Sequence, residues 1–233
     1  GTSPDMTSSG WLVIFDCDGV LVDSERLNVR TWTAMMRDAG VDFSEQDAVE
    51  TFVGRAYKDN RVTLTELTGA VPDPTWEQAW RREFARSQED LEPITGAGEA
   101  VDAVRDLGHD VCVASGSLLD AIDTKLRRTG LEGHFAAETR FSAEQVERGK
   151  PAPDLFLFAA ERLGVAPADC IVIEDSAAGV RAAKAAGMRV IGLTAGSHAV
   201  QARLAERLPA LHPDAIVADA AELPATITRL LGD

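Results

Sequence analysis

Two short acidic groups among the 38 acidic residues could do chemistry together, one near the start of the chain and one about three quarters of the way along it. Asp16 and Asp18 are separated by a single residue, and Glu174 and Asp175 are adjacent. If folding brings these carboxylates into one small volume, their mutual repulsion raises their pKa values unless a cation neutralises them. Oxygen ligands favour a hard ion, and Mg²⁺ commonly combines one or two carboxylates with water and a substrate phosphate. The pattern therefore indicates a Mg²⁺ site.

Lys150 and Ser115 add groups that can bind a phosphate. Lys150 supplies a fixed positive charge, and Ser115 with nearby backbone N–H groups can hold phosphate oxygens. Together with Asp16 and Asp18 they supply a nucleophile, a general acid/base, a metal site and a charge clamp. Phosphoryl transfer needs this set, because its catalysis is largely positioning plus charge neutralisation. Each residue alone also has a structural explanation, such as a serine N-cap or a surface lysine, so the prediction depends on the whole set.

A repeated pattern of short apolar runs and helix-like segments can position these residues. The apolar runs, which we predict to be strands, cover residues 11–15, 110–114, 170–174, 189–192 and, more weakly, 215–218. Predicted helices at 97–107, 118–129 and 177–186 are each followed by a glycine suited to a helix C-cap. This alternation predicts an α/β fold with a doubly wound parallel sheet, a Rossmann-like core. The carboxyl ends of such strands share one edge, so residues distant in sequence meet there.

The connection between the first two predicted strands is more than ninety residues long, far more than one crossover helix needs. It holds candidate capping boxes that begin at Ser44 and Thr75, and an apolar stripe through Trp76, Trp80 and Phe84 that we interpret as packing. We therefore predict two domains, an α/β core of residues 1–23 and 93–233 and an inserted α-helical cap of residues 24–92.

Composition excludes several classes of function. The net charge of −15 over 233 residues argues against nucleic-acid binding, which usually requires a basic face. No apolar run approaches the roughly 18–20 residues that a membrane span requires. Residues 1–10 lack the pattern of a secretory signal, so we interpret them as a leader in which Met6 could be the natural start. We expect a monomer, because nothing in the sequence demands an assembly.

The three cysteines, Cys17, Cys112 and Cys170, form neither a disulfide framework nor a metal-ligand spacing. Each lies in or beside an apolar strand-like run. Buried thiols of this kind are typical of a protein in a reducing compartment, so we expect a cytoplasmic location.

The chemistry-bearing residues resemble the motifs of the haloacid dehalogenase superfamily. Asp16-Cys-Asp-Gly-Val-Leu-Val-Asp-Ser24 is similar to its first motif, Ser115 to the second, Lys150 to the third and Glu174-Asp175 to the fourth. The resemblance extends over nearly the whole chain, including the helical cap. Cap position and the segments around Lys150 and Asp175 look most like the branch that contains β-phosphoglucomutase and many sugar-phosphate phosphatases.

This resemblance implies a mechanism and a role for each motif residue. Asp16 would attack phosphorus and form an aspartyl-phosphate, while Asp18 would act as general acid and then as general base. Mg²⁺ would be held by the Asp16 carboxylate, the Asp18 backbone carbonyl and Asp175, with Glu174 bound directly or through water. The implied phosphate-binding residues are Cys17, Asp18, Ser115, Gly116 and Lys150.

The resemblance leaves more than one activity open. Asp18 can protonate a departing alcohol, so it favours a phosphatase or mutase over the dehalogenase branch. Asn28 stands where the mutase has a histidine, and none of the four histidines (His109, His134, His198 and His212) lies in the predicted cap. We therefore favour a phosphatase of small phosphorylated metabolites, with a hexose-phosphate mutase as the alternative and a non-catalytic phosphate-ligand-binding regulator as a third hypothesis. Arg55 or Lys58 in the cap is a candidate contact to the substrate.

Overall fold

The computed structural model describes residues 10–232. The predicted leader, apart from Gly10, and the start of the predicted core segment 1–23 therefore lie outside the described residues. Within them, the strands are β1 Leu12–Phe15, β2 Asp110–Ser115, β3 Arg140–Ser142, β4 Cys170–Glu174, β5 Arg189–Leu193 and β6 Ala215–Val217. They form one sheet in the order β3-β2-β1-β4-β5-β6, and each neighbouring pair is parallel. The predicted α/β class and parallel sheet are confirmed, and the strand β3 is an addition that the apolar runs did not indicate.

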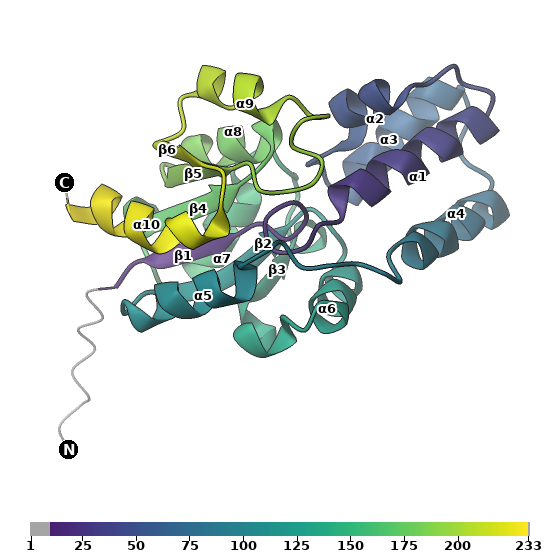
Figure 1. Ribbon diagram of the computed structural model, residues 1–233. Coiled ribbons are helices and arrows are strands. Elements are labelled where there is room, and N and C mark those ends of the chain that lie inside the picture. Colours follow the sequence, from purple (N-terminus) through teal and green to yellow (C-terminus); the bar gives the residue numbers. More distant parts are fainter. Residues whose placement is uncertain (1–9, 233) are drawn as a thin grey trace.

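Helices cover both faces of the sheet and also form a separate group beside it (Figure 1). The α-helices are α1 Glu25–Asp38, α2 Glu45–Phe52, α3 Tyr57–Thr68, α4 Pro74–Ser87, α5 Ala97–Asp106, α6 Leu119–Arg128, α7 Asp154–Arg162, α8 Ala177–Ala185, α9 Leu204–Arg207 and α10 Leu223–Gly232. Short 3₁₀ helices cover Glu132–His134, Ala137–Thr139, Ala143–Gln145, Pro167–Asp169, Pro209–Leu211 and Ala220–Glu222.

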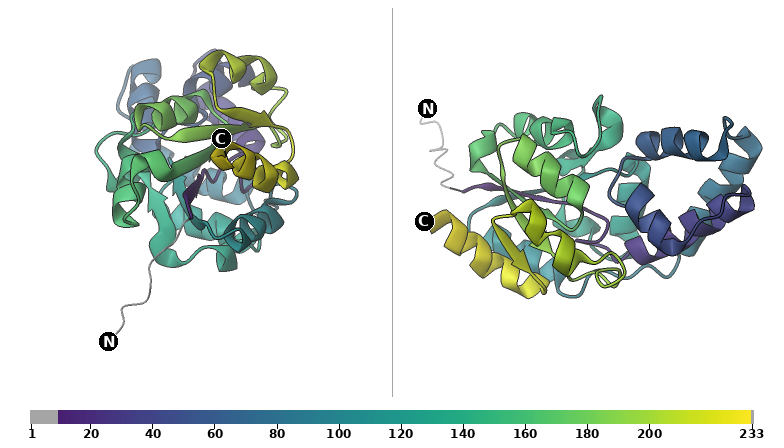
Figure 2. Two further views of the ribbon diagram at one scale, coloured as in Figure 1. Left: turned by 90° about the vertical axis from the view of Figure 1, so that its left-hand side faces the viewer. Right: turned by 90° about the horizontal axis from the view of Figure 1, so that it is seen from above.

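The continuous apolar run of β1 lies at the centre of the sheet and is buried on both faces. Leu12 and Ile14 pack in a cluster with residues of α7 and α8, whereas Val13 and Phe15 pack in a second cluster with residues of α5, α6 and α10. Figure 2 shows these two helical layers on either side of the strands. Successive side chains of a strand point to opposite faces, so a strand between two helical layers must be apolar throughout.

Helices α1 to α4 lie beyond the carboxyl ends of the strands, inside the segment 24–92 that we predicted to be a cap (Figure 1). We call these four helices the cap helices, or cap, and the sheet with its covering helices the core. Their centre is aromatic. Trp32 stacks on Phe52 with ring centroids 4.1 Å apart, and Phe84 meets Trp32 edge to face at 4.9 Å. Trp76 and Trp80 are partly buried against the same cluster, as the packing interpretation of their stripe predicted.

One of the two predicted capping boxes is present. Ser44 accepts from the backbone of Asp47, and the Asp47 side chain accepts from the backbone of Ser44. The box predicted at Thr75 is wrong, because α4 begins at Pro74 and its N-cap is Asp73, two residues before the predicted cap. Proline is well suited to the first helical position, since its missing N–H would have no partner there.

The two segments that connect the cap helices to the core run side by side. Val22 and Pro93 form an isolated antiparallel bridge. The backbone N–H of Asp23 donates to Glu92 O at 2.9 Å, and that of Ile94 donates to Leu21 O at 2.9 Å. Across the described part of the chain, no helix combines the length and apolarity needed to cross a membrane.

Candidate active site

Three of the four predicted acidic residues meet at the carboxyl edge of the sheet. Asp16 follows β1, Glu174 ends β4, and Asp175 follows it directly. Ligand oxygens of these three carboxylates all lie within 4.8 Å of one another, and all three residues are buried. The first and fourth motifs are therefore neighbours, because β1 and β4 pair in the sheet although more than 150 residues separate them in sequence.

Lys150 places its ammonium group between two of these carboxylates. Its Nζ lies 3.1 Å from Asp16 Oδ1 and 2.7 Å from Glu174 Oε2. It also donates to the backbone carbonyl of Ala114 at 3.2 Å and stands 5.0 Å from the centre of the Phe156 ring. The side chain is buried, although it also lines the cavity described below.

This arrangement leaves more negative than positive charge. Burial, followed by the neighbouring Glu174 carboxylate, raises the pKa of Asp16 well above its ordinary value. Burial and the charges of Glu174 and Glu25 likewise raise the pKa of Asp175. Burial also opposes ionisation of Glu174, but Lys150 more than offsets it, so the pKa of Glu174 is lowered. One ammonium group thus faces three buried carboxylates, and their oxygen-only donor set fits a hard divalent ion such as Mg²⁺.

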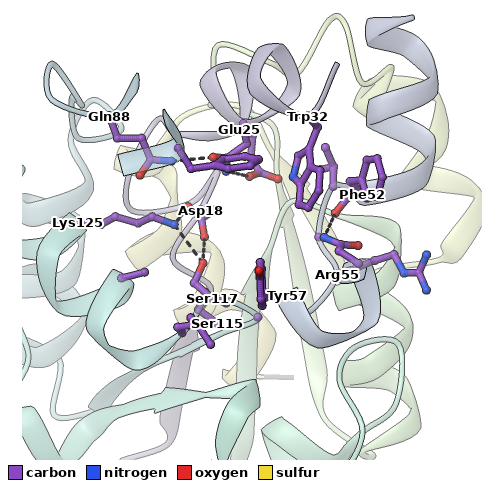
Figure 3. A pocket seen from close by; sticks show the side chains of 18 of the residues that line it. Asp18, Glu25, Trp32, Phe52, Arg55, Tyr57, Gln88, Ser115, Ser117 and Lys125 are labelled. Atoms are coloured by element: carbon purple, nitrogen blue, oxygen red, sulfur yellow. Dashed lines mark hydrogen bonds and ion pairs between the residues drawn. The ribbon is translucent and has the colours of Figure 1, made fainter. Parts of the chain in front are cut away.

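Asp18 is held apart from this cluster by a different set of donors (Figure 3). Lys125 Nζ lies 2.7 Å from Asp18 Oδ1, Ser117 Oγ donates to Oδ2 at 2.8 Å, and the Ser24 hydroxyl also donates to Oδ1. Burial would raise the pKa of Asp18, but the Lys125 charge and these hydrogen bonds lower it overall. The carboxylate is therefore both oriented and kept ionised.

The sequence analysis did not identify Lys125. It lies on α6 between the buried residues Ile122 and Leu126, on the face that packs against the sheet. A lysine on the apolar face of a predicted helix was the available signal, because lysine is seldom buried without a partner.

The sequence analysis also missed His198, which follows β5 at the same edge of the sheet. Its Nε2 atom lies 2.7 Å from Asp175 Oδ2, and the side chain is buried. The signal that could have found it is the one used for the other residues, a polar side chain shortly after a predicted parallel strand.

A cavity of about 350 Å³ lies between the cap helices and the carboxyl edge of the sheet. Such a volume suits a small metabolite. From the core, the motif residues Asp16, Asp18, Ser115, Gly116 and Lys150 line it. From the cap, aromatic and polar side chains line it, among them Glu25, Asn28, Trp32, Phe52, Arg55, Tyr57, Phe84 and Gln88. Figure 3 shows Trp32, Phe52 and Tyr57 on the side of the cavity that faces Asp18 and Ser115.

Four of the five predicted phosphate-binding residues, Asp18, Ser115, Gly116 and Lys150, line the cavity, and Cys17 directly follows Asp16. The backbone N–H of Cys17 donates to Asp16 Oδ1 at 2.8 Å. Ser115 is buried at the end of β2, and its Oγ accepts from the backbone N–H of Ser117 at 3.1 Å. Gly116 packs close to the cap, since a Cβ atom there would lie 3.2 Å from the carbonyl oxygen of Arg55.

The two cap cations that we predicted as substrate contacts are placed differently. Arg55 lines the cavity, but its guanidinium group extends away from Asp18 and donates to Thr51 O at 3.2 Å (Figure 3). Lys58 lies outside the cavity lining, and its ammonium group donates to three backbone carbonyls of the core, those of Ala143, Val146 and Glu147. Lys58 therefore joins cap to core in this structure.

Asn28, at the position of the mutase histidine, belongs to a chain of amide hydrogen bonds. Its Nδ2 donates to Glu25 Oε1 at 2.9 Å, and its Oδ1 accepts from Gln88 Nε2 at 2.7 Å. A side-chain amide does not exchange protons near neutral pH, so this position offers hydrogen bonds rather than acid/base chemistry.

Several known proteins are similar to this chain in sequence. The chain is 30% identical over 188 residues to 6-phosphogluconate phosphatase from Escherichia coli, a match that covers 80% of this chain and 83% of that protein. It is 35% identical over 182 residues to hexitol phosphatase B from Escherichia coli, covering 76% of this chain and 81% of that protein. A further relative, Protein SUPPRESSOR OF QUENCHING 1 from Arabidopsis thaliana, is 35% identical over 187 residues, but the match spans only 17% of its length.

A solved structure is also similar to this chain. The chain is similar to a HAD family hydrolase from Deinococcus radiodurans, crystallised with bound phosphate and sodium, with a TM-score of 0.70 and 30% identity over 95% of this chain and 96% of that one. The model of the haloacid dehalogenase-like hydrolase family matches residues 12–187, from β1 through the motif that holds Asp175. The chain is therefore an enzyme of the haloacid dehalogenase-like hydrolase family, with phosphatases among its relatives.

Proposed function

We propose that this enzyme is a Mg²⁺-dependent phosphatase that hydrolyses small phosphorylated metabolites, of the sugar-phosphate class, through an aspartyl-phosphate at Asp16. The observation that supports this most strongly is the meeting of Asp16, Lys150, Glu174 and Asp175, of which Asp16 and Lys150 line a cavity of metabolite size. Phosphoryl transfer requires an aligned nucleophile and neutralised charge, and these residue types supply both.

In the first step, a carboxylate oxygen of Asp16 forms a bond to phosphorus while the bond from phosphorus to the ester oxygen breaks. Asp18, which is ionised in the free enzyme, takes up a proton from solvent as the substrate binds, because the negative charge of the phosphate raises its pKa. It then gives this proton to the departing oxygen, and the alcohol leaves. In the second step, a water oxygen attacks the same phosphorus, Asp18 takes a proton from that water, and the bond to Asp16 breaks. Inorganic phosphate is released and both aspartates are regenerated.

The other motif residues bind and orient in this proposal. Ser115, Lys150 and the backbone N–H groups of Cys17, Asp18 and Gly116 would hold the phosphoryl oxygens. The Asp16 and Asp175 carboxylates and the Asp18 backbone carbonyl would hold Mg²⁺, with Glu174 bound directly or through water. Bound Mg²⁺ supplies charge neutralisation for the phosphoryl group and its flanking carboxylates.

Two observations support a sugar-type substrate. The cavity combines aromatic faces with amide and carboxylate groups, a lining that suits a small molecule with both C–H and hydroxyl groups. Relatives over three quarters or more of the chain are a 6-phosphogluconate phosphatase and a hexitol phosphatase. We further propose that the enzyme acts as a monomer in a reducing cytoplasm, without nucleic-acid or membrane partners. Its three free buried cysteines support the reducing compartment, and its net charge of −15 argues against nucleic-acid binding.

Release of inorganic phosphate from a panel of phosphate esters, with and without Mg²⁺, tests this function. We expect Mg²⁺-dependent release from sugar and polyol phosphates, and no release from a folded Asp16→Asn variant. The asparagine has nearly the same shape but lacks the nucleophilic carboxylate. Retained turnover by the variant would contradict the assigned nucleophile, and a wild-type protein inert on every ester would contradict the function.

A hexose-phosphate mutase is the second candidate, because the first motif and cap position resemble that branch and Arg55 lines the cavity. It predicts interconversion of hexose-phosphate isomers that depends on a bisphosphorylated sugar, with little net release of phosphate. Asn28 argues against it, because an amide cannot replace a histidine in proton transfer. Phosphate that accumulates as fast as substrate disappears would exclude the mutase.

A further inference from the structure

His198 is buried beside the fourth motif, at 1% exposure. Its Nε2 atom lies 2.7 Å from Asp175 Oδ2. We propose that His198 is a positioning residue that orients the Asp175 carboxylate for Mg²⁺, an inference that rests on the proposed Mg²⁺-dependent function. No motif that we identified in the sequence includes this histidine.

The imidazole ring has little room to take another position. A Cβ atom at Gly19 would lie 3.0 Å from His198 Cε1 and 2.1 Å from Asp175 Oδ2. A Cβ atom at Gly196 would lie 2.5 Å from His198 Nδ1. Gly19 also has φ +83°, a backbone conformation that favours glycine. Glycines on both sides thus allow the loop after β1 and the loop after β5 to close on the histidine–aspartate pair.

The loop that carries His198 is fastened to the first motif. The backbone N–H and the hydroxyl group of Ser197 both donate to Asp23 Oδ1, each at 2.9 Å. Asp23 lies in the segment that leads from Asp16 to the cap, and its own backbone N–H donates to Glu92 O. This anchor fixes the residue next to His198 from outside the metal cluster.

The direction of the hydrogen bond follows from the role of Asp175. A carboxylate that binds a metal ion is ionised and can only accept, so the hydrogen lies on Nε2 of His198. The hydrogen bond from Nε2 occupies Oδ2 of Asp175 and fixes the rotation of the carboxylate. The other carboxylate oxygen, Oδ1, is left for the ion. Among the described residues, Nδ1 of His198 has no hydrogen-bond partner, although it is buried. The ring is therefore held by its contact with Asp175 and not by a bond on its other side.

Direct binding of Mg²⁺, measured by calorimetry on the intact protein, tests the role. Loss of a hydrogen-bonding partner behind a metal ligand typically costs about 10–100-fold in metal affinity. We expect His198→Leu, which keeps the bulk but removes the donor, to raise the Mg²⁺ Kd by that factor. At saturating Mg²⁺ its kcat should approach that of the wild type, because His198 does not touch the reacting groups. His198→Gln should recover most of the affinity, since its amide nitrogen can reach the place of Nε2.

Two outcomes would overturn the inference. One is an unchanged Mg²⁺ Kd in folded His198→Leu, and the other is an equal loss in the leucine and glutamine variants, which would make packing rather than donation responsible. If His198→Leu does not fold, Asp23→Ala replaces it, because this change removes the loop anchor and touches neither the ring nor Asp175. Unchanged Mg²⁺ binding by Asp23→Ala would then overturn it. Failure of the proposed function is distinct, because there the wild type itself would release no phosphate.

Discussion

Replacement of Lys150 by methionine removes the one ammonium group that contacts both Asp16 and Glu174 while keeping a side chain of similar length. At the distances of 2.7 Å and 3.1 Å, each attraction amounts to about 5–6 kcal/mol at an effective dielectric constant of about 20. Desolvation of the three buried groups offsets much of this in the wild type. In the variant the two carboxylates stay buried but lose the ammonium charge that compensates for their burial. We therefore expect a loss of about 3–5 kcal/mol in the free energy of unfolding.

The loss should depend on pH in a defined direction. Without Lys150, the folded-state pKa of Asp16 rises further above its unfolded value, and that of Glu174 loses the main interaction that keeps it lowered, so burial raises it. A carboxyl group with a raised folded pKa destabilises the fold above its unfolded pKa and ceases to do so once protonated. The destabilisation should therefore be largest near neutral pH and shrink as the pH falls towards about 4. The wild type behaves differently at alkaline pH. Its neighbours raise the pKa of Lys150 above the ordinary 10.5, so its contribution is complete below that pH and is lost as the pH rises through the folded value.

Urea denaturation of the metal-free proteins at several pH values provides the measurement. Lys184→Met is the matched control. Lys184 is exposed at the end of α8 and donates to the carbonyls of Leu211 and His212, which precede β6 at the opposite end of the sheet from Asp16. We expect the control to cost about 1 kcal/mol or less at every pH. If Lys150→Met costs no more than Lys184→Met at neutral pH, the ammonium group does not compensate the buried carboxylates and our electrostatic account of the site is wrong.

Three further predictions address the acid/base group, the metal site and the cap. Asp18→Asn should lower kcat/KM for sugar phosphates by about 10²–10⁴-fold, with a smaller loss for p-nitrophenyl phosphate in single-turnover release of p-nitrophenol, because that leaving group needs no proton; equal losses for both esters would contradict the acid role. Mg²⁺ should raise the Tm more at about pH 8 than at about pH 5, because the raised pKa values of Asp16 and Asp175 make protons compete with the ion at the lower pH; a shift independent of pH would exclude these carboxylates as ligands. Ser44→Ala should lose about 0.5–2 kcal/mol in urea denaturation through its N-cap, whereas Thr75→Ala should lose less, since Asp73 is the residue that caps α4.

The sequence predicts the parts of this protein that follow from local pattern and from sheet topology. Strand β1 is recognisable because a strand between two helical layers must be apolar on both sides. Once the sheet is parallel, Asp16 and Glu174 must lie at one edge, and their pairing across β1 and β4 needs no further information. The same reasoning brings Ser115 to that edge at the end of β2.

The parts that escaped prediction depend on side-chain reach and on the packing of distant elements. Lys125 enters the site from within α6, and only the three-dimensional packing of that helix shows that its ammonium group reaches Asp18. Lys58 was expected to face a substrate, yet its flexible side chain is long enough to reach core carbonyls instead. Strand β3 has only three residues, which is too short for a periodic sequence pattern. It is recognised as a strand only by its pairing with β2.

The paired connection between cap and core, through Val22 and Pro93, has a consequence for access to the cavity. Two hydrogen-bonded segments can twist and bend together, but they resist sliding past each other because that would break the bonds at Asp23 and Ile94. We therefore expect the cap to rotate about this connection and to open the cavity on the side opposite to it. Substrates would then be selected first by the width of that opening, so a branched or bulky ester could be excluded even where the cavity behind it has space.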